Sequence, residues 1–269
     1  MDTLKVAVGQ FPASNDIEEN KQFISQLVSK AAMAKVELLV LPEASMCSFA
    51  SELNVLREMS QRHTPDFIEF IKQLSIQHNM HIVVGVLSLN KDPAEQRVQN
   101  QLLVLNNKGE VISQYNKIHV YDAFKFKESD KVQPGTLYED GSMFGIFKIK
   151  EFCFGLINCY DLRFPELARA LVSRGVNVLS ISANWIPGAY KEMHWDLLLR
   201  TRAVENTSYV LASGQTAPKG VGQSMVIDPM GFVLASCGEQ VGIQVQDLSI
   251  KRIEEVRELL PCLANRRLV

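Results

Sequence analysis

Apolar positions in the first third of the chain follow two periodicities in turn. Short, β-branched runs at 4–11, 38–41 and 82–87 have the length and composition of buried strands. Between them, apolar residues recur every three or four positions from 17 to 32, and a second helical stretch covers about 66 to 78. This strand–helix–strand order predicts an α/β protein whose sheet is covered by helices.

The rest of the chain adds hairpins to this pattern. Strand-like segments occur in pairs around turn signals such as Asn107-Lys108-Gly109 and Asp228-Pro229-Met230-Gly231. The predicted hairpins pair 101–105 with 111–115, 146–149 with 152–157, and 224–227 with 232–235. The other predicted elements are helices at 165–174 and 190–205 and strands at 178–181 and 209–212. Because no linker or repeat interrupts them, we expect residues 1–269 to form one domain with layered sheets inside and helices outside.

The composition is that of an ordinary globular protein. The chain has 269 residues, 46% hydrophobic and 22% charged, and no biased tract, which excludes the collagen-like, disordered and disulfide-scaffold classes. Lys and Arg total 28 against 30 Asp and Glu. The basic excess typical of nucleic-acid binding is missing, so we expect no nucleic-acid partner.

Targeting and redox signals point to the cytoplasm. No apolar stretch approaches the roughly 18–20 residues of a membrane-spanning helix, so we expect no membrane partner. The first residues lack a cationic region followed by an apolar core, so we expect no signal peptide. The five cysteines are an odd number and are spread along the chain, which is typical of reduced thiols.

Polar residues that follow predicted strands are the candidates for chemistry, because functional side chains gather at the carboxyl ends of strands in open α/β sheets. Glu43, Lys117 and Cys159 each follow a predicted strand and differ in type from packing residues. Pro165 predicts that a helix begins within about one turn of it. Cys159 therefore lies at a strand-to-helix bend, where helix amides favour a thiolate and could hold an oxyanion.

Each of the three residues also has an ordinary structural interpretation. Free cysteines are usually small core residues, and for Cys159 this interpretation and the nucleophilic one carry similar weight. Glu43 or Lys117 taken alone is typical of a protein surface. Together, however, a carboxylate that accepts the thiol proton and an ammonium that stabilises thiolate and oxyanion suffice for acyl transfer through a thioester. Such chemistry requires neither a metal nor a cofactor, so we expect none.

The sequence contains residues for other kinds of site. A Cys–His pair that uses His119 or His194 stays open, because sequence spacing does not exclude either histidine. His78 and His81 lie three residues apart without a third ligand nearby, which argues against a zinc site. The glycine pair at 220–222 lacks the lysine pattern of a P-loop, which argues against a phosphate site.

Three segments, in this order, resemble the catalytic signatures of the nitrilase or carbon–nitrogen hydrolase superfamily: Leu41-Pro42-Glu43, Asn116-Lys117-Ile118-His119 and Asn158-Cys159-Tyr160-Asp161-Leu162-Arg163-Phe164-Pro165-Glu166. Flanking segments are similar too, at 126–129, 133–135, 194–195, 202–206 and 222–231. The resemblance extends from Val6 to about Arg267. One departure is Lys150-Glu151, a hairpin turn in which relatives often have glycine.

This resemblance implies a fold, an assembly and a set of roles. The fold would be a four-layer α-β-β-α sandwich, and protomers would pair into a homodimer. Cys159 would be the nucleophile and Glu43 the general base and acid, while Lys117 and the Tyr160 amide would form the oxyanion hole. A second glutamate, Glu128, would orient the lysine and the substrate.

The segments 117–124, 183–185, 191–195 and 260–267 look like the bacterial branch of deaminated glutathione amidases. Such enzymes hydrolyse a small amide, N-(4-oxoglutaryl)-cysteinylglycine, to 2-oxoglutarate and cysteinylglycine. Trp185 and His194 lie in these segments and are taken as substrate-binding or supporting residues. Arg163 is a candidate for binding a substrate carboxylate through two hydrogen bonds. A salt bridge that only braces the loop is an equally good explanation for Arg163.

Two other functions are compatible with the sequence. The nearest is that of an omega-amidase that acts on 2-oxoglutaramate, or of an enzyme for another small carboxylated amide. The second, from another class, is a non-catalytic binding protein that keeps the nitrilase fold. The presence of Glu43, Lys117 and Cys159 argues against this second function.

Overall fold

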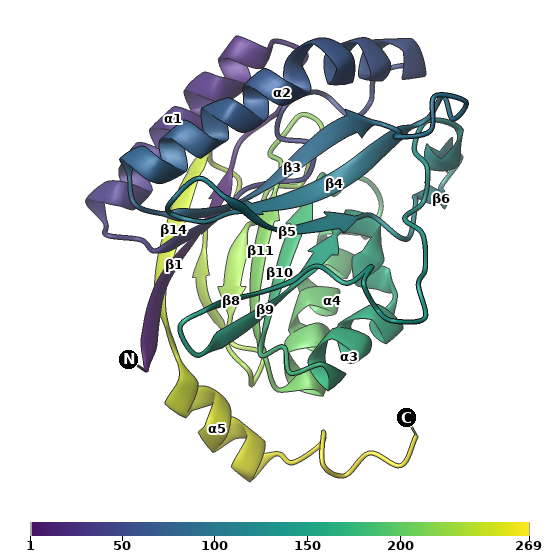
Figure 1. Cartoon of the computed structure of the whole chain (residues 1–269). Helices are drawn as coiled ribbons and strands as arrows, with labels where there is room; N and C mark the ends of the chain where they lie inside the picture. The colour runs from purple at the N-terminus through teal and green to yellow at the C-terminus, as the bar shows by residue number, and fades with distance from the viewer. Residues whose placement is uncertain (1, 269) are drawn as a thin grey trace.

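The computed structural model describes residues 2–268 and arranges them in four layers (Figure 1). Two six-stranded sheets lie in the middle. Helices α1 (Ile17–Met33) and α2 (Leu53–Gln77) cover the outer face of one sheet, and α3 (Pro165–Ser173) and α4 (Lys191–Asn206) cover the other. The α-β-β-α sandwich expected from the sequence is confirmed.

The first sheet has the strand order β14-β1-β2-β3-β4-β5. Its strands are β1 (Thr3–Gln10), β2 (Leu38–Val40), β3 (His81–Leu89), β4 (Val98–Leu105), β5 (Val111–Asn116) and β14 (Gly242–Ser249). Only β1, β2 and β3 run parallel. Along β1, Leu4, Val6 and Val8 belong to the core between the sheets, whereas Ala7 belongs to the core under α1 and α2. This division follows from the two-residue repeat of a strand.

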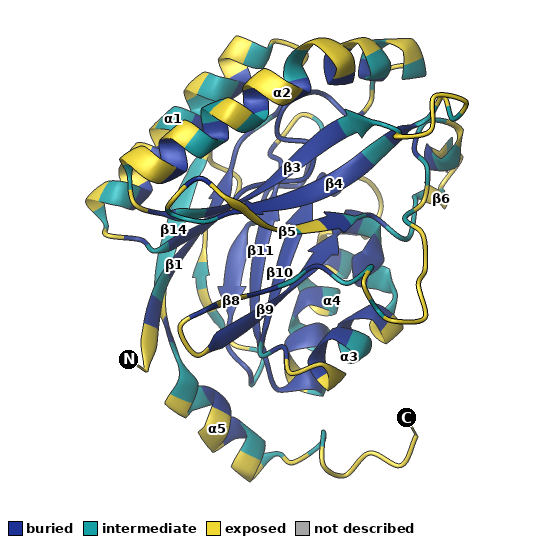
Figure 2. Ribbon diagram, in the orientation of Figure 1, coloured by how far each residue is buried: buried dark blue, intermediate teal, exposed yellow. Residues whose placement is uncertain are grey.

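The second sheet has the order β13-β12-β11-β10-β9-β8. Its strands are β8 (Ile146–Ile149), β9 (Phe152–Asn158), β10 (Val178–Ala183), β11 (Tyr209–Gly214), β12 (Met225–Ile227) and β13 (Val233–Ser236). The central strands β9, β10 and β11 are parallel and wholly buried, as Figure 2 shows in dark blue. Burial on both faces explains why these strands have continuous apolar runs in the sequence.

The three predicted hairpins are confirmed as antiparallel pairs of β4 with β5, β8 with β9, and β12 with β13. The turn between β8 and β9 uses Lys150 at φ +53°, the left-handed region that favours glycine. The turn therefore keeps the conformation that a glycine would adopt. The Lys150 ammonium also reaches Glu37, at an N···O distance of 2.5 Å.

Two parts of the fold differ from the sequence prediction. Helix α2 begins at Leu53 rather than near 66, because it continues through Pro65 with its apolar face still buried. Strand β14 and the following helix α5 (Ile250–Leu259) were not predicted. Most of β14 is only partly buried, so its residues lack a strong apolar pattern. It becomes a strand by pairing with β1 along the whole length of both.

Among residues 2–268, no helix combines the length and the apolar character needed to cross a membrane.

Gly85 in β3 allows the backbone that follows β2 to lie directly against the first sheet. A Cβ at this position would stand 2.4 Å from the Ala44 nitrogen and 2.6 Å from the Glu43 Cα. The Ser45 amide donates to the Gly85 carbonyl over 2.9 Å, and the Gly85 amide donates to the Pro42 carbonyl over 3.2 Å. The backbone of Glu43 thus rests on a surface that only glycine provides.

We predict that Gly85→Ala lowers the free energy of unfolding by roughly 1–3 kcal/mol, because the methyl group must displace backbone atoms rather than a flexible side chain. Urea unfolding followed by circular dichroism measures this change. Gly242→Ala in β14 is the matched control, because no heavy atom lies within 4 Å of a Cβ there. Equal stability of the two variants would contradict the prediction.

Candidate active site

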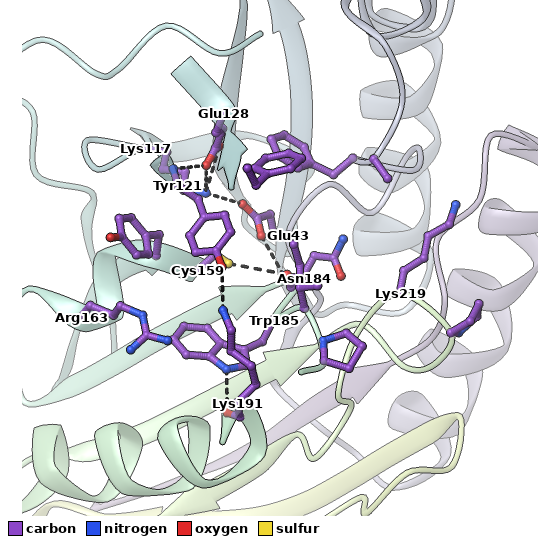
Figure 3. A pocket seen from close by; sticks show the side chains of 17 residues that line it. Glu43, Lys117, Tyr121, Glu128, Cys159, Arg163, Asn184, Trp185, Lys191 and Lys219 are labelled. Carbon is purple, nitrogen blue, oxygen red and sulfur yellow. Dashed lines mark hydrogen bonds and ion pairs between the residues drawn. The ribbon is translucent and has the colours of Figure 1, made fainter. Parts of the chain in front are cut away.

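The ends of three strands bring Glu43, Lys117 and Cys159 into one cavity between the sheets (Figure 3). Glu43 follows β2 after two residues, Lys117 follows β5 directly, and Cys159 follows β9 directly. Since β2 and β5 belong to the first sheet and β9 to the second, the site depends on the packing of one sheet on the other. All three residues are buried, with exposed fractions of 1%, 2% and 8%.

An ion cluster with one ammonium and two carboxylates forms the floor of this site. The Lys117 Nζ lies 2.9 Å from Glu43 Oε1 and 3.0 and 2.9 Å from the two oxygens of Glu128. Asn100 Nδ2 donates to Glu43 Oε1 over 2.8 Å, and the backbone amide of Asn184 donates to Glu43 Oε2 over 2.7 Å. A buried ammonium is tolerated only when such partners replace its water, so the cluster explains how Lys117 can be fully enclosed.

Glu128 reaches Lys117 from a segment that lies between the two sheets in sequence. A two-stranded ribbon, β6 (Asp122–Ala123) and β7 (Phe126–Lys127), leads into a short 3₁₀ helix that begins at Glu128. The Tyr121 amide donates to Glu128 Oε2. Burial raises the pKa of Glu128, Lys117 opposes this shift, and Glu43 adds to it.

Cys159 stands at a strained bend. It begins a short 3₁₀ helix, η2 (Cys159–Arg163), and has a φ of +53°, which residues other than glycine rarely adopt. Its Sγ is 3.8 Å from the Asn184 carbonyl, the one sulfur contact drawn in Figure 3. The strain directs the thiol into the cavity beside Glu43.

The buried carboxylate of Asp161 holds this bend against the lysine segment. It accepts hydrogen bonds from the Tyr115 hydroxyl over 2.8 Å and from the His119 amide over 2.9 Å. These two donors flank Lys117 in the sequence, so one carboxylate ties the turn of Cys159 to the segment of Lys117. The positions of thiol and ammonium are therefore coupled through the backbone.

The surroundings set the resting protonation of the cluster. Burial would raise the pKa of Glu43, but Lys117 and the Asn184 amide hold it below its ordinary value. Burial raises the pKa of the Cys159 thiol well above its usual range, and Glu43 raises it further against the effect of Lys117. Burial lowers the pKa of Lys117, but the carboxylates of Glu128 and Glu43 outweigh it and hold this pKa well above its usual value. At neutral pH the site therefore holds a thiol, an ammonium and the carboxylate of Glu43.

The expectation that the bend favours a resting thiolate is wrong for this reason. Helix α3 begins only at Pro165, after the turn of η2. Helix amides act over about one turn, whereas burial and the Glu43 carboxylate act directly on the Cys159 sulfur. The thiol needs a base, and Glu43 is in the correct state to serve as one.

The cavity above the cluster has a volume of about 180 Å³, which admits a small molecule. Tyr160, Arg163 and Trp185 line it, as the sequence indicated for substrate-binding residues. The Arg163 guanidinium carbon lies 4.7 Å from the centre of the Trp185 ring. His194 does not line the cavity. Its Nδ1 is 3.4 Å from an Arg163 nitrogen, so it contacts the arginine without lining the cavity itself.

The alternative Cys–His pair has no geometric basis. His119 stacks on Phe164 with ring centres 3.7 Å apart, and its Nδ1 lies 2.7 Å from Asp161 Oδ1. Neither His119 nor His194 lines the cavity that contains Cys159. Within residues 2–268, no group of three or more His, Cys, Asp or Glu side chains is arranged to hold a metal.

Sequence reasoning missed four residues that shape the site. Asn184 follows β10 directly, so the strand-end rule that selected Glu43 could have found it. Asn100 lies within the apolar strand β4, where an isolated amide is a weaker signal. Lys191 and Lys219 also line the cavity. Lys191 lies in the segment 191–195 that resembles the amidases, which was the one available signal for it, whereas nothing in the local sequence distinguishes Lys219 from a surface lysine.

The chain matches known proteins over nearly its whole length. The family model described as carbon-nitrogen hydrolase covers residues 5–258. A protein of Escherichia coli O157:H7 named deaminated glutathione amidase is 33% identical over 97% of both chains. A Bos taurus protein of the same name is 31% identical over 97% of this chain and 81% of its own length.

Solved structures give the same result. The NitFhit protein of Caenorhabditis elegans superposes with a TM-score of 0.88 at 30% identity, over 99% of this chain and 66% of that one. A Saccharomyces cerevisiae member of branch 10 of the nitrilase superfamily has a TM-score of 0.85 at 26% identity, over 99% and 97%. The chain belongs to the carbon-nitrogen hydrolase family, and this membership indicates an enzyme that hydrolyses amides.

Proposed function

We propose that this chain is an amidase that cleaves deaminated glutathione, N-(4-oxoglutaryl)-cysteinylglycine, to 2-oxoglutarate and cysteinylglycine through a thioester on Cys159. The observation that carries the chemistry is the ammonium of Lys117 held between Glu43 and Glu128 beside a buried thiol. The choice of substrate is supported by relatives of that name and by a cavity lined with cations.

Acylation starts with the thiol. Glu43 takes the Cys159 proton while the sulfur attacks the amide carbon, and the carbonyl electrons move onto oxygen. The Lys117 ammonium and the Tyr160 amide stabilise that oxyanion, and losing one such donor typically costs about 10²–10³ in rate. Glu128 holds the ammonium in place through its two oxygens.

The leaving amine departs with the proton that Glu43 carries. The carbon–nitrogen bond breaks, Glu43 protonates the nitrogen, and an acyl-thioester remains on Cys159. Glu43, again a carboxylate, then takes a proton from water, and the hydroxide attacks the thioester carbon. The carbon–sulfur bond breaks, and Glu43 returns the proton to the sulfur. Each cycle requires a reduced thiol on Cys159. Because all five cysteines are free, we place the reaction in the cytoplasm, where thiols stay reduced.

We expect wild-type protein to release cysteinylglycine from N-(4-oxoglutaryl)-cysteinylglycine, with product identification by mass. Cys159→Ala should lower kcat by a factor on the order of 10⁶, because removing a nucleophile abolishes the covalent route. Cys153→Ala, on the strand β9 that leads to Cys159 but outside the cavity, is the matched control and should keep wild-type activity.

Other products, or none, would indicate a different function. Ammonia from 2-oxoglutaramate without cysteinylglycine release would indicate an omega-amidase. Binding without turnover of either amide would indicate a non-catalytic member of the family. A Cys159→Ala enzyme with near wild-type activity would refute the role of the thiol.

The pH dependence of kcat/KM follows from the pKa directions. Glu43 titrates below its ordinary value of 4.5, so it remains a base as pH falls toward that value. Cys159 and Lys117 titrate well above their ordinary values of 9.0 and 10.5, so both keep their protons as pH rises. We therefore predict that kcat/KM stays constant within a factor of two from about pH 6 to pH 8. A steady tenfold change across this range, measured with stable protein, would contradict these assignments.

We also propose that two copies pair through the outer face of α4. Met193 and Leu197, one turn apart on this helix, are 54% and 55% exposed, and Phe232 on the turn before β13 is 66% exposed. That turn touches α4, because Arg200 donates to the Gly231 carbonyl over 3.0 Å. An apolar surface on α4 and its neighbouring turn is typical of a protein interface.

Leu197→Asp should convert a dimer into a monomer, because it puts a charge in the centre of this apolar surface. Light scattering after size-exclusion chromatography measures the mass. Leu259→Asp on α5, which is 76% exposed, is the control and should leave the mass unchanged. A wild-type monomer, or a Leu197→Asp dimer, would refute the proposed interface.

A further inference from the structure

The cavity carries more positive charge than the proposed chemistry uses. Its lining includes four cations and two carboxylates, namely Lys117, Arg163, Lys191 and Lys219 with Glu43 and Glu128. Both carboxylates contact Lys117. Among the described residues, none of the other three cations forms an ion pair with a carboxylate. The whole chain has a formal net charge of −2, so this local excess of positive charge does not follow from the overall composition. It indicates that the cavity binds an anionic ligand.

Two of these cations share one wall. The Arg163 guanidinium stacks over Trp185, and the Trp185 Nε1 donates to the Lys191 carbonyl over 2.9 Å. The Lys191 ammonium donates to the Tyr121 hydroxyl over 2.6 Å. Burial and the nearby Arg163 lower the pKa of Lys191, so the two positive charges are close enough to repel each other. An anion bound between them would relieve that repulsion.

The third cation lies on the other side of the nucleophile. Figure 3 shows Lys219 and Arg163 on opposite sides of Cys159. The Lys219 ammonium donates to the Ser48 hydroxyl over 2.5 Å. Ser48 lies five residues after Glu43, and Figure 3 draws Glu43 on the Lys219 side of Cys159.

We propose that Lys219 binds an anionic group on the leaving amine, while Arg163 and Lys191 bind a carboxylate on the acyl side. The preferred substrates are therefore amides with a carboxylate on each side of the bond that breaks. This inference rests on the proposed function, because Glu43 must reach the leaving nitrogen. An anionic arm on that nitrogen then extends past Glu43 toward Lys219.

A bracing role through Ser48 does not explain the charge of Lys219. A hydroxyl accepts a hydrogen bond from the ammonium but leaves its positive charge uncompensated, whereas a carboxylate both accepts and neutralises. Arg163 and Lys191 on the opposite wall likewise have aromatic or hydroxyl partners that leave their charges uncompensated. The two ends would also fix the amide relative to Cys159, which lowers the entropic cost of the attack.

The test compares two ligands that differ only at the leaving side. N-glutarylglycine has a carboxylate there, and N-ethylglutaramate has a methyl group in its place. Binding is measured by isothermal titration calorimetry in the Cys159→Ala background, where neither ligand is cleaved. We expect N-glutarylglycine to bind roughly tenfold more tightly, as is typical of a hydrogen bond to a charged group.

Adding Lys219→Ala should remove this preference by weakening only the N-glutarylglycine complex. Lys219→Gln, which keeps a polar end for Ser48 but removes the charge, should do the same and serves if the alanine variant unfolds. Ser48→Ala should leave the preference intact, and Lys108→Ala, an exposed lysine far along the chain, is the matched control. Arg163→Ala should weaken both ligands equally.

The proposal is overturned if N-glutarylglycine does not bind, if both ligands bind equally, or if Lys219→Gln retains the preference. Failure of the proposed function is seen separately in wild-type protein. A wild-type protein that prefers N-glutarylglycine but hydrolyses no amide would refute the amidase function and leave the Lys219 subsite supported.

Discussion

The burial of one ammonium group constrains the rest of the site. Lys117 is only 2% exposed, and a lone ammonium at that depth would cost several kcal/mol in lost hydration. Two carboxylates at 2.9 Å replace the lost water, and each comes from a different part of the chain. The ends of β2 and β5 and the short 3₁₀ helix that begins at Glu128 must therefore converge for the cluster to be tolerated at all. The second sheet closes the arrangement, because the amide of Asn184 completes the contacts of Glu43.

This cluster also decides the protonation state of Cys159, the proposed nucleophile. Many reactive cysteines rest as thiolates at helix N-termini, where amides lower the thiol pKa. Cys159 has the opposite balance, because burial and the Glu43 carboxylate raise its pKa more than Lys117 lowers it. A neutral thiol beside an ionised base costs less to bury than a thiolate does. In the proposed mechanism, the proton moves only during attack, when the carbonyl oxygen takes up the charge near Lys117.

Charge outside the cluster points to the ligand. Arg163, Lys191 and Lys219 have aromatic, hydroxyl or histidine neighbours within hydrogen-bond or stacking distance. Such neighbours position a cation without neutralising it, so its field stays available for an anion. The cavity thus has an ion cluster on its floor, where we propose that the chemistry occurs, and cations without carboxylate partners on its walls. This arrangement is consistent with an amidase whose substrate carries its negative charge away from the reacting carbonyl.

The amino-acid pattern alone determined the layered α/β architecture, the three hairpins and the choice of Glu43, Lys117 and Cys159. These features depend on local periodicity and on residues next to strand ends, and both are visible within a few positions. The strand β14 could not be predicted, because its edge position comes from pairing with β1 across the whole chain. Asn184 follows β10 directly, so the strand-end rule extends to it. Only the tertiary structure identified Asn100, Lys191 and Lys219, and only it reversed the expected pKa shift of the thiol. Distances between segments remote in sequence set these properties, and a linear pattern does not contain such distances.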